Sequence, residues 1–165
     1  MSTCIYGFIE VKLFDTGFDN WYSAIDISAI FTGNYDIFGC LFGVRNPSNF
    51  APLFADRGLP KDCCDNIKED FESGEYRNPT WCSYKELVCI DREEKALAPD
   101  SRVYKMHGGV RIKGYPDSDE ERALAKVMSR GDVLKGAEYD TLVELMSVLV
   151  KRYGEEGVRW VAYFD

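Results

Sequence analysis

The chain has a single histidine, His107, and no Cys-x-x-Cys pair among its 165 residues. A mixed zinc site commonly takes two histidines, and a nucleophilic thiol needs a neighbouring base, which is often an imidazole. The six cysteines stand at positions 4, 40, 63, 64, 82 and 89. We interpret them as reduced thiols that pack within the fold, and we expect neither a metal nor a cofactor.

Positive charge is also in short supply, with 20 lysines and arginines against 28 acidic residues and a net charge of −8. Proteins that bind duplex nucleic acid gain their affinity from clustered cationic side chains, so this balance argues against such a partner and leaves room only for a local basic patch. The sequence has no apolar run of the roughly 18 residues that indicate a membrane span, and no signal peptide. We expect a cytoplasmic protein without a membrane partner.

The sequence carries none of the common catalytic signatures, such as a phosphate-binding Walker loop, a nucleophile elbow or an HExxH pair. The acidic runs 119–121 and 155–156 stand where helix ends are expected, and there solvated charge explains them better than acid and base catalysis. We therefore expect a protein that binds its target rather than an enzyme.

The length fits one domain, which we place at residues 1–165. Residues 4–14 and 21–27 are rich in β-branched and aromatic side chains, so they predict a hairpin whose turn lies at 15–17. The closing segment 158–165 is apolar on both faces, which is typical of a central strand. We predict an α+β fold, in which a mixed or antiparallel sheet built from the N-terminal hairpin and the C-terminal strand is covered by three or four helices.

Capping residues and apolar periodicity predict these helices. Ser83 and Glu86 have the spacing of a capping box, and so do Ser118 and Glu121. The expected helices cover residues 35–42 after Asn34, 62–71 with Asp62 as the cap, 84–97, the segment from Ser118 to Gly131, and 137–153.

Two segments contain candidate ligand-binding residues. The stretch 102–115 is the most cationic part of the chain and contains the Gly108-Gly109 pair, which favours a tight hairpin turn or else a mobile loop. Its backbone amides and its side chains Lys105, His107, Arg111 and Lys113 are candidates to hold a phosphate, and the alternative, which a glycine-rich match alone favours, is a plain surface hairpin.

The second candidate is the long segment 45–62, which lacks helical or strand periodicity. We expect Arg57, beside Gly58, to be its main anion contact, with Arg45 joining from the other end. The alternative is an arginine that bonds loop carbonyls. Trp81 is a candidate to stack on a nucleobase, and its alternative is a place in the core.

Three motifs in the first half of the chain resemble those of a family of small hypothetical proteins from phages and bacterial genomes. They are Tyr35-x-x-Phe38-x-x-Leu41-x-Gly43-Val44-Arg45, Arg57-Gly58-Leu59-Pro60-x-Asp62 and Trp81-x-Ser83-x-x-Glu86-Leu87. The segments 4–12 and 158–165 are similar to that family as well. By this comparison residues 92–136 look like an insertion, and histidines that some members carry near the first strand are missing here.

The resemblance implies an anti-defence role in the cytoplasm of a host cell. We expect a homo-oligomer that sequesters a nucleotide second messenger, such as a cyclic nucleotide, without cleaving it. One alternative is a protein inhibitor of a host defence enzyme, and another is a small nucleotide-hydrolysing enzyme.

Overall fold

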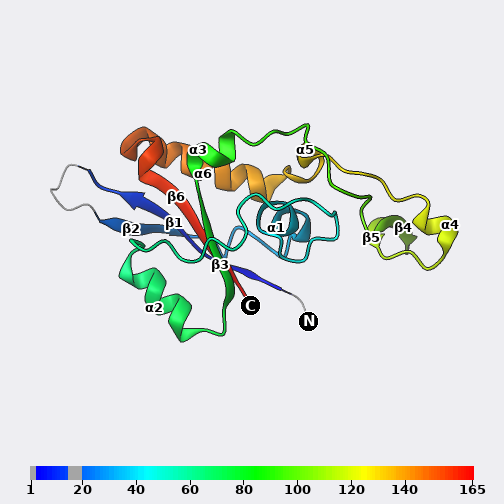
Figure 1. Cartoon of the computed structure of the whole chain (residues 1–165), viewed down its shortest axis with the longest axis horizontal. Helices are drawn as coiled ribbons and strands as arrows, with labels where there is room; N and C mark the ends of the chain where they lie inside the picture. The colour runs from blue at the N-terminus through cyan, green and yellow to red at the C-terminus, as the bar shows by residue number, and fades with distance from the viewer. Residues whose placement is uncertain (1–2, 15–19) are drawn as a thin grey trace. The chain divides into compact units, whose positions relative to one another are not determined.

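The computed structural model describes residues 3–14 and 20–165, and the chain divides into two compact units, whose elements are labelled in Figure 1. Unit 1 contains residues 1–34, 54–90 and 135–165, and unit 2 contains residues 35–53 and 91–134. The sequence gives unit 2 ten basic and ten acidic residues, so unit 1, with ten basic and 18 acidic residues, carries the whole net charge of −8.

Unit 1 is built on a four-stranded antiparallel sheet in the order β2-β1-β6-β3. Its strands are β1 (Ile5–Lys12), β2 (Trp21–Asp26), β3 (Arg77–Ser83) and β6 (Val158–Phe164). The predicted N-terminal hairpin, the central C-terminal strand and the α+β class are confirmed, and the sheet is antiparallel rather than mixed. The turn expected at 15–17 lies outside the described residues.

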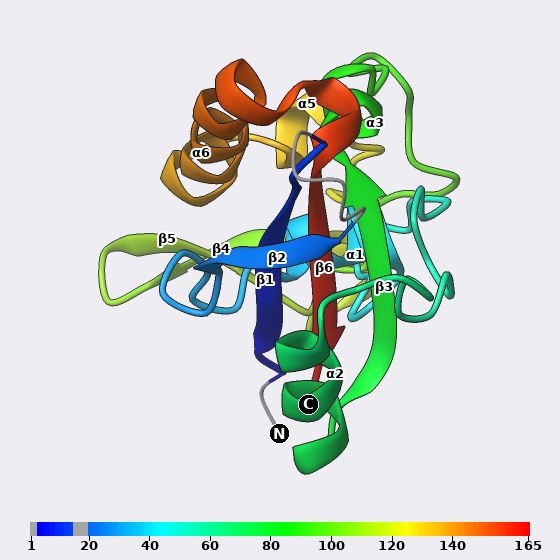
Figure 2. The same ribbon diagram turned by 90° about the vertical axis from the view of Figure 1, so that its left-hand side faces the viewer.

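Strand β6 is buried along its whole length because both of its faces are covered. On one face Val161 and Tyr163 pack with Cys63 and with Ile67 of α2 (Asp65–Ser73). Figure 2 shows α2 in front of the lower ends of β6 and β3. Gly7 of β1 is held at φ +131°, and a Cβ there would lie 2.0 Å from the carbonyl oxygen of Val161, so the close approach of β1 to β6 requires glycine.

Two more helices of unit 1 pack against the sheet, namely α3 (Tyr84–Val88) and α6 (Ala137–Tyr153), and the 3₁₀ turn Glu155–Gly157 leads from α6 into β6. Helix α6 has the predicted bounds, because its apolar stripe and its glycine at each end agree. The capping box of Ser83 and Glu86 is also present. With α2, three helices therefore cover the sheet.

Three helix predictions were wrong in part. Helix α3 ends at Val88 rather than at residue 97, because the following segment pairs with 128–131 in unit 2: Ala96 N donates to Met128 O at 2.9 Å. Asp62 does not cap α2, whose N-cap is Cys64. Its carboxylate accepts hydrogen bonds from Trp21 and Arg159 instead.

The third correction concerns the helix expected from Ser118 to Gly131. The Ser118 side chain does accept from the Glu121 amide, but α4 covers only Asp119–Arg122, and a separate helix α5 (Arg130–Val133) begins at its own cap, Ser129. Between them, backbone pairing to residues 94–100 replaces helical hydrogen bonds, as in the bond from Asp100 N to Lys126 O.

Unit 2 contains α1 (Tyr35–Phe42), α4, α5 and the hairpin of β4 (Val103–His107) and β5 (Val110–Gly114). The side chain of Arg130 is only 1% exposed and links separate segments of unit 2. Its guanidinium donates to Glu94 Oε1 at 2.8 Å, Cys40 O at 3.2 Å and Ala51 O at 2.9 Å. Each buried N–H of the guanidinium that has an acceptor avoids the desolvation cost of a buried, unpaired donor.

The segment 45–62 contains no helix or strand, as predicted. Within residues 3–14 and 20–165, no helix is long and apolar enough to cross a membrane.

Candidate functional site

The site is built on the β4–β5 hairpin of unit 2. Its register pairs Tyr104 with Lys113 and His107 with Val110, across a two-residue turn in which Gly108 and Gly109 have φ +57° and +81°. The predicted hairpin is therefore confirmed over the mobile-loop alternative. Because side chains alternate across a strand, Tyr104, Arg111 and Lys113 lie on one face, and Lys105 and His107 lie on the other.

The Arg111 face borders a cavity of about 280 Å³. This volume is close to the lower end of the range of small-molecule sites, about 300–1,000 Å³. Four cationic side chains and one aromatic ring contribute to its wall, beside a single acidic residue. The lining residues are Asp100, Arg102, Val103, Tyr104, Arg111, Lys113, Leu124, Lys126 and Met128.

An ion-pair network at the base of the cavity fixes two of these cations. Arg102 Nη2 donates to Asp36 and lies 3.0 Å from Asp100 Oδ2, and Lys113 Nζ lies 3.0 Å from Asp36 Oδ2 and 3.2 Å from Asp100 Oδ2. The hydroxyl of Ser48 lies 2.7 Å from Asp36 Oδ1. Two carboxylates thus balance the charges of Arg102 and Lys113.

The network also sets the protonation of its acids. Burial acts to raise the pKa of Asp100, but the hydrogen bonds and charge of Arg102, with the charge of Lys113, outweigh it and hold that pKa below its ordinary value. The pKa of Asp36 is lowered in the same way, where burial is outweighed by the Ser48 hydrogen bond and by the two cations. Both groups are therefore carboxylates at neutral pH.

These lowered pKa values predict an acid-sensitive stability. A carboxyl whose pKa is lowered by folding stabilises the protein fully above its unfolded pKa, near the ordinary value of 3.8, and loses that contribution as the pH falls through the folded value. We expect the free energy of unfolding, measured by urea titration, to fall as the pH drops below about 4. Asp100→Asn should reduce the size of this fall, and an unchanged pH dependence in that variant would contradict the network.

Arg111 and Lys126 are the cations that the network leaves uncompensated. In the described part of the chain neither has an ion-pair partner, and both are exposed. The Arg111 guanidinium lies 4.2 Å from the centre of the Tyr104 ring, which is 52% exposed. A cation at this distance is attracted to the ring face, and the contact does not use the N–H groups of the guanidinium as hydrogen-bond donors. The cavity therefore carries two positive charges in excess.

The other sequence candidates from this stretch lie apart from the cavity. Lys105 Nζ is 2.6 Å from Asp117 Oδ2 and 2.9 Å from Glu121 Oε2, and these acids already neutralise it. His107 is exposed on the same face of the hairpin. The structure therefore brings Arg111 and Lys113 together and separates Lys105 and His107 from them.

Arg57 and Trp81 belong to unit 1. There they are part of a row in which aromatic rings and cations alternate, made of Phe54, Arg57, Trp81, Arg159 and Trp21. The Arg57 guanidinium lies 4.9 Å from the Phe54 ring and 5.4 Å from the Trp81 ring, and it forms a two-point ion pair with Glu86 at 2.8 and 3.1 Å. It also donates to the Trp81 carbonyl at 3.2 Å. These contacts are the ones expected of an arginine that holds a loop in place.

We expect Arg57→Ala to lower stability rather than to remove the anion contact expected from the sequence, because the guanidinium is engaged by Glu86. The pair is partly exposed, at 28% and 37%, so solvent screening limits its contribution to about 1 kcal/mol. For a chain of this size that corresponds to a fall in Tm of about 2–4 °C. A loss of nucleotide affinity with no change in Tm would instead restore Arg57 as the anion contact.

The row continues through a buried ion pair. Arg159 lies 3.8 Å from the Trp21 ring and 5.8 Å from the Trp81 ring, and its Nε donates to Glu10 Oε2 at 2.6 Å. The Glu10 side chain is fully buried and also accepts from the Cys64 amide at 2.8 Å. This arrangement ties the start of α2 to β1 and β6.

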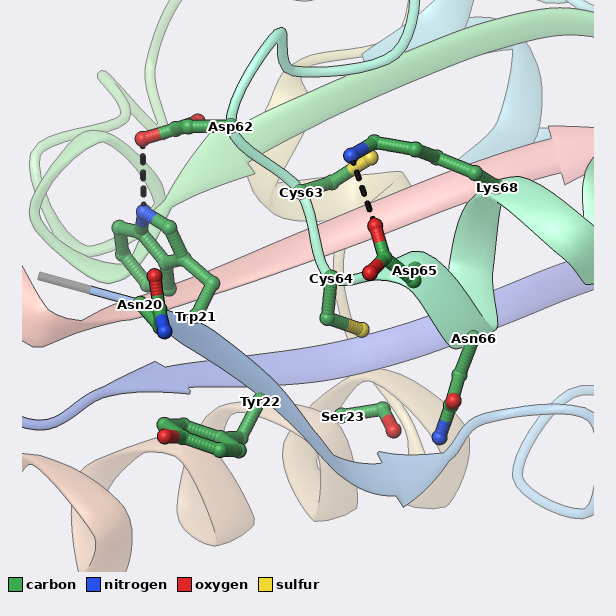
Figure 3. A pocket seen from close by; sticks show the side chains of 10 residues that line it. All are labelled: Asn20, Trp21, Tyr22, Ser23, Asp62, Cys63, Cys64, Asp65, Asn66 and Lys68. Atoms are coloured by element: carbon green, nitrogen blue, oxygen red, sulfur yellow. Dashed lines mark hydrogen bonds and ion pairs between the residues drawn. The ribbon is translucent and has the colours of Figure 1, made fainter. Parts of the chain in front are cut away.

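Unit 1 has a larger cavity of about 530 Å³ beside this row. Figure 3 shows Trp21 bonded to Asp62 on one side and the pair of Lys68 and Asp65 on the other, with the Cys64 thiol between them. Among the described residues Lys68 is the one cationic side chain that lines it, and a carboxylate 3.1 Å away neutralises this charge. The cavity is therefore less suited to an anion than the cavity of unit 2.

The remaining candidates, Arg45 and Gly58, both stand at positive φ, of +50° and +72°. Arg45 belongs to unit 2 and Gly58 to unit 1, and neither lines a cavity described above. All six cysteines are free thiols, and within residues 3–14 and 20–165 no group of three metal-ligating side chains comes together.

Tyr104, Arg102 and Lys126 line the cavity but were not predicted from the sequence. The two-residue turn determines on which face of the hairpin Tyr104 lies. Because the turn pairs His107 with Val110, residue 104 stands opposite Lys113 and on the same face. Lys126 comes from a segment that was expected to be helical, so no local signal places it at the hairpin.

Comparisons of the chain with protein-family models, curated proteins and solved structures find no match. The assignment of the site therefore depends on its geometry and charge.

Proposed function

We propose that the protein binds a nucleotide, such as a cyclic nucleotide second messenger, in the cavity of unit 2 that Arg111 and Lys126 line and holds it without cleavage. The observation that carries this proposal is the pair of uncompensated cations, Arg111 and Lys126, beside the exposed ring of Tyr104. The cations can form charge-assisted hydrogen bonds with a phosphate, and the ring can pack against a base or a sugar. The volume fits one nucleotide unit better than a whole dinucleotide.

The acidic residue that lines this cavity favours binding over catalysis. Asp100 is held as a carboxylate by Arg102 and Lys113, and its lowered pKa makes it a weak base at neutral pH. General bases work best with a pKa near the operating pH. We infer that a bound nucleotide is retained unchanged.

The resemblance to small phage and bacterial proteins supports a biological setting for this binding. A protein that removes a signalling nucleotide from a host-cell cytoplasm needs a formed pocket and no catalytic group. We propose this anti-defence role, with the ligand held in a homo-oligomer.

Chromatography of a nucleotide mixture tests the proposal. Cyclic mononucleotides, cyclic dinucleotides and nucleoside polyphosphates are incubated with the protein, the free fraction is analysed, and the protein is then heated to release what it holds. We expect one nucleotide to be depleted and then to return unchanged. Return of an altered nucleotide would indicate a hydrolase, and absence of depletion would contradict the proposal.

A second candidate is an inhibitor of a basic host protein. The specific observation in its favour is that unit 1 carries the whole net charge of −8, which suits docking onto a cationic partner. This function predicts no nucleotide depletion, so the same chromatography distinguishes the two.

A further inference from the structure

The outer edge of β5 is open. In the described residues β4 and β5 pair only with each other. A two-residue turn begins with a hydrogen-bonded pair, here His107 and Val110, and bonded and non-bonded pairs then alternate. Arg111 and Lys113 therefore direct their backbone N–H and C=O groups outward. Val110 and Ile112 are 62% and 44% exposed beside this edge.

A second copy of the same strand fits this edge. When two β5 strands pair antiparallel about a two-fold axis at Ile112, all five residues are matched, with each Val110 opposite Gly114 of the other copy. The pairing turns a two-stranded ribbon, which is marginal alone, into a four-stranded sheet. It also covers the exposed Val110 and Ile112 side chains on the face away from the cavity.

Charge opposes this pairing until an anion is bound. In the same register Arg111 stands directly opposite Lys113 of the second copy, on the face that borders the cavity, and like charges directly opposite each other are destabilising. A phosphate held by Arg111 and Lys126 supplies the missing negative charge at that point. Five residues a side are also far fewer than the 20–30 a side of a stable interface.

We propose that two copies of the chain pair through their β5 edges when a nucleotide occupies the cavity, and separate when it leaves. This inference rests on the proposed function, since the nucleotide phosphate is what removes the repulsion between Arg111 and Lys113. Nucleotide binding and dimerisation then strengthen each other by the same factor.

Sedimentation analysis of the full chain, with and without the nucleotide mixture described above, tests the proposal. We expect a mass of 18.8 kDa alone and twice that mass with nucleotide. Retention of a nucleotide at the monomer mass would overturn this inference and the homo-oligomer of the proposed function, and it would leave nucleotide sequestration standing. A dimer without nucleotide would overturn the dependence on ligand, and failure to retain any nucleotide would overturn both proposals.

A substitution at Ile112, with a control on α6, locates the interface. Ile112→Lys places like charges on the two-fold axis outside the cavity lining, so the variant should stay a monomer and still bind the nucleotide, with an affinity reduced only by the coupling factor. Val148→Lys, at a 60% exposed position of α6, makes the same change elsewhere and should still dimerise.

Ile112→Cys tests the register by a different readout. Non-hydrogen-bonded antiparallel pairs have Cα atoms about 4.5 Å apart, within disulfide range. Mild oxidation should therefore cross-link the Ile112→Cys protein only when nucleotide is present, with the wild-type chain as the control for its exposed Cys4 and Cys89. Equal cross-linking with and without nucleotide, or none in either case, would overturn the two-fold pairing.

Discussion

Replacing Arg111 by alanine is expected to weaken nucleotide binding about 10- to 150-fold, which corresponds to the 1.5–3 kcal/mol of a typical charge-assisted hydrogen bond. The reason is that Arg111 has no carboxylate partner among the described residues and stacks 4.2 Å from the Tyr104 ring, so its N–H groups are oriented for a ligand. Tm should stay within about 2 °C, because exposed side chains away from special features contribute little to stability. Calorimetric titration with the depleted nucleotide measures the affinity.

Lys105→Ala is the matched control. Lys105 stands on the paired strand one position from Tyr104, but on the other face of the hairpin, where Asp117 and Glu121 neutralise it. Its loss should leave affinity within about two-fold, since its charge is screened from the cavity. Arg111→Lys keeps the charge but loses the planar fork, so its affinity should lie between those of wild type and Arg111→Ala. Equal losses for Lys105→Ala and Arg111→Ala would show that the effect is general electrostatics.

The second large effect concerns stability. Glu10→Gln is expected to lower the free energy of unfolding by about 3–5 kcal/mol, because it leaves the Arg159 charge, 6% exposed, without its buried partner. Asp62 remains at 2.8 Å, but its side chain is 59% exposed and replaces little of the lost interaction. For a chain of this size the change corresponds to a fall in Tm of about 6–20 °C. Thermal unfolding followed by circular dichroism measures it.

Glu144→Gln controls for the chemistry of the substitution, because Glu144 is exposed on α6 and should change the free energy of unfolding by less than about 0.5 kcal/mol. Replacing Glu10 and Arg159 together by leucine and methionine should recover part of the loss, since no unpaired charge then remains. A Glu10→Gln protein with the Tm of wild type would show that the buried pair does not hold β1 and β6 to the start of α2.

The elements predicted correctly are those whose local signals agree with their packing. Helix α6 has an apolar stripe between Gly136 and Gly154, and β6 is apolar on both faces, so each is readable without its neighbours. The segments after Val88 and Ser118 were expected to be longer helices. Both contain good helix formers, but there the backbone pairs with a distant segment, and such tertiary pairing overrides local propensity.

The candidate site was predictable only in part, for the same reason. The cationic composition of 105–113 drew attention to the hairpin, and alternation across its strands separates Arg111 and Lys113 from Lys105. Composition alone does not show that Asp36 and Asp100 already balance Lys113, while Arg111 is left in excess. Arg57 was favoured because glycine and proline flank it, yet the Glu86 that engages it is 29 residues away.

An amide NMR titration of the labelled full chain with the depleted nucleotide shows most directly whether the ligand binds in the cavity beside Arg111. We expect large shifts for amides of residues that line this unit 2 cavity, including Arg102, Tyr104, Arg111 and Lys126, with saturation at one nucleotide per chain. Amides around the larger cavity of unit 1, such as those of Cys64 and Lys68, should not move. Shifts confined to the unit 1 cavity, with none at Arg111 or Lys126, would contradict the assignment of the site.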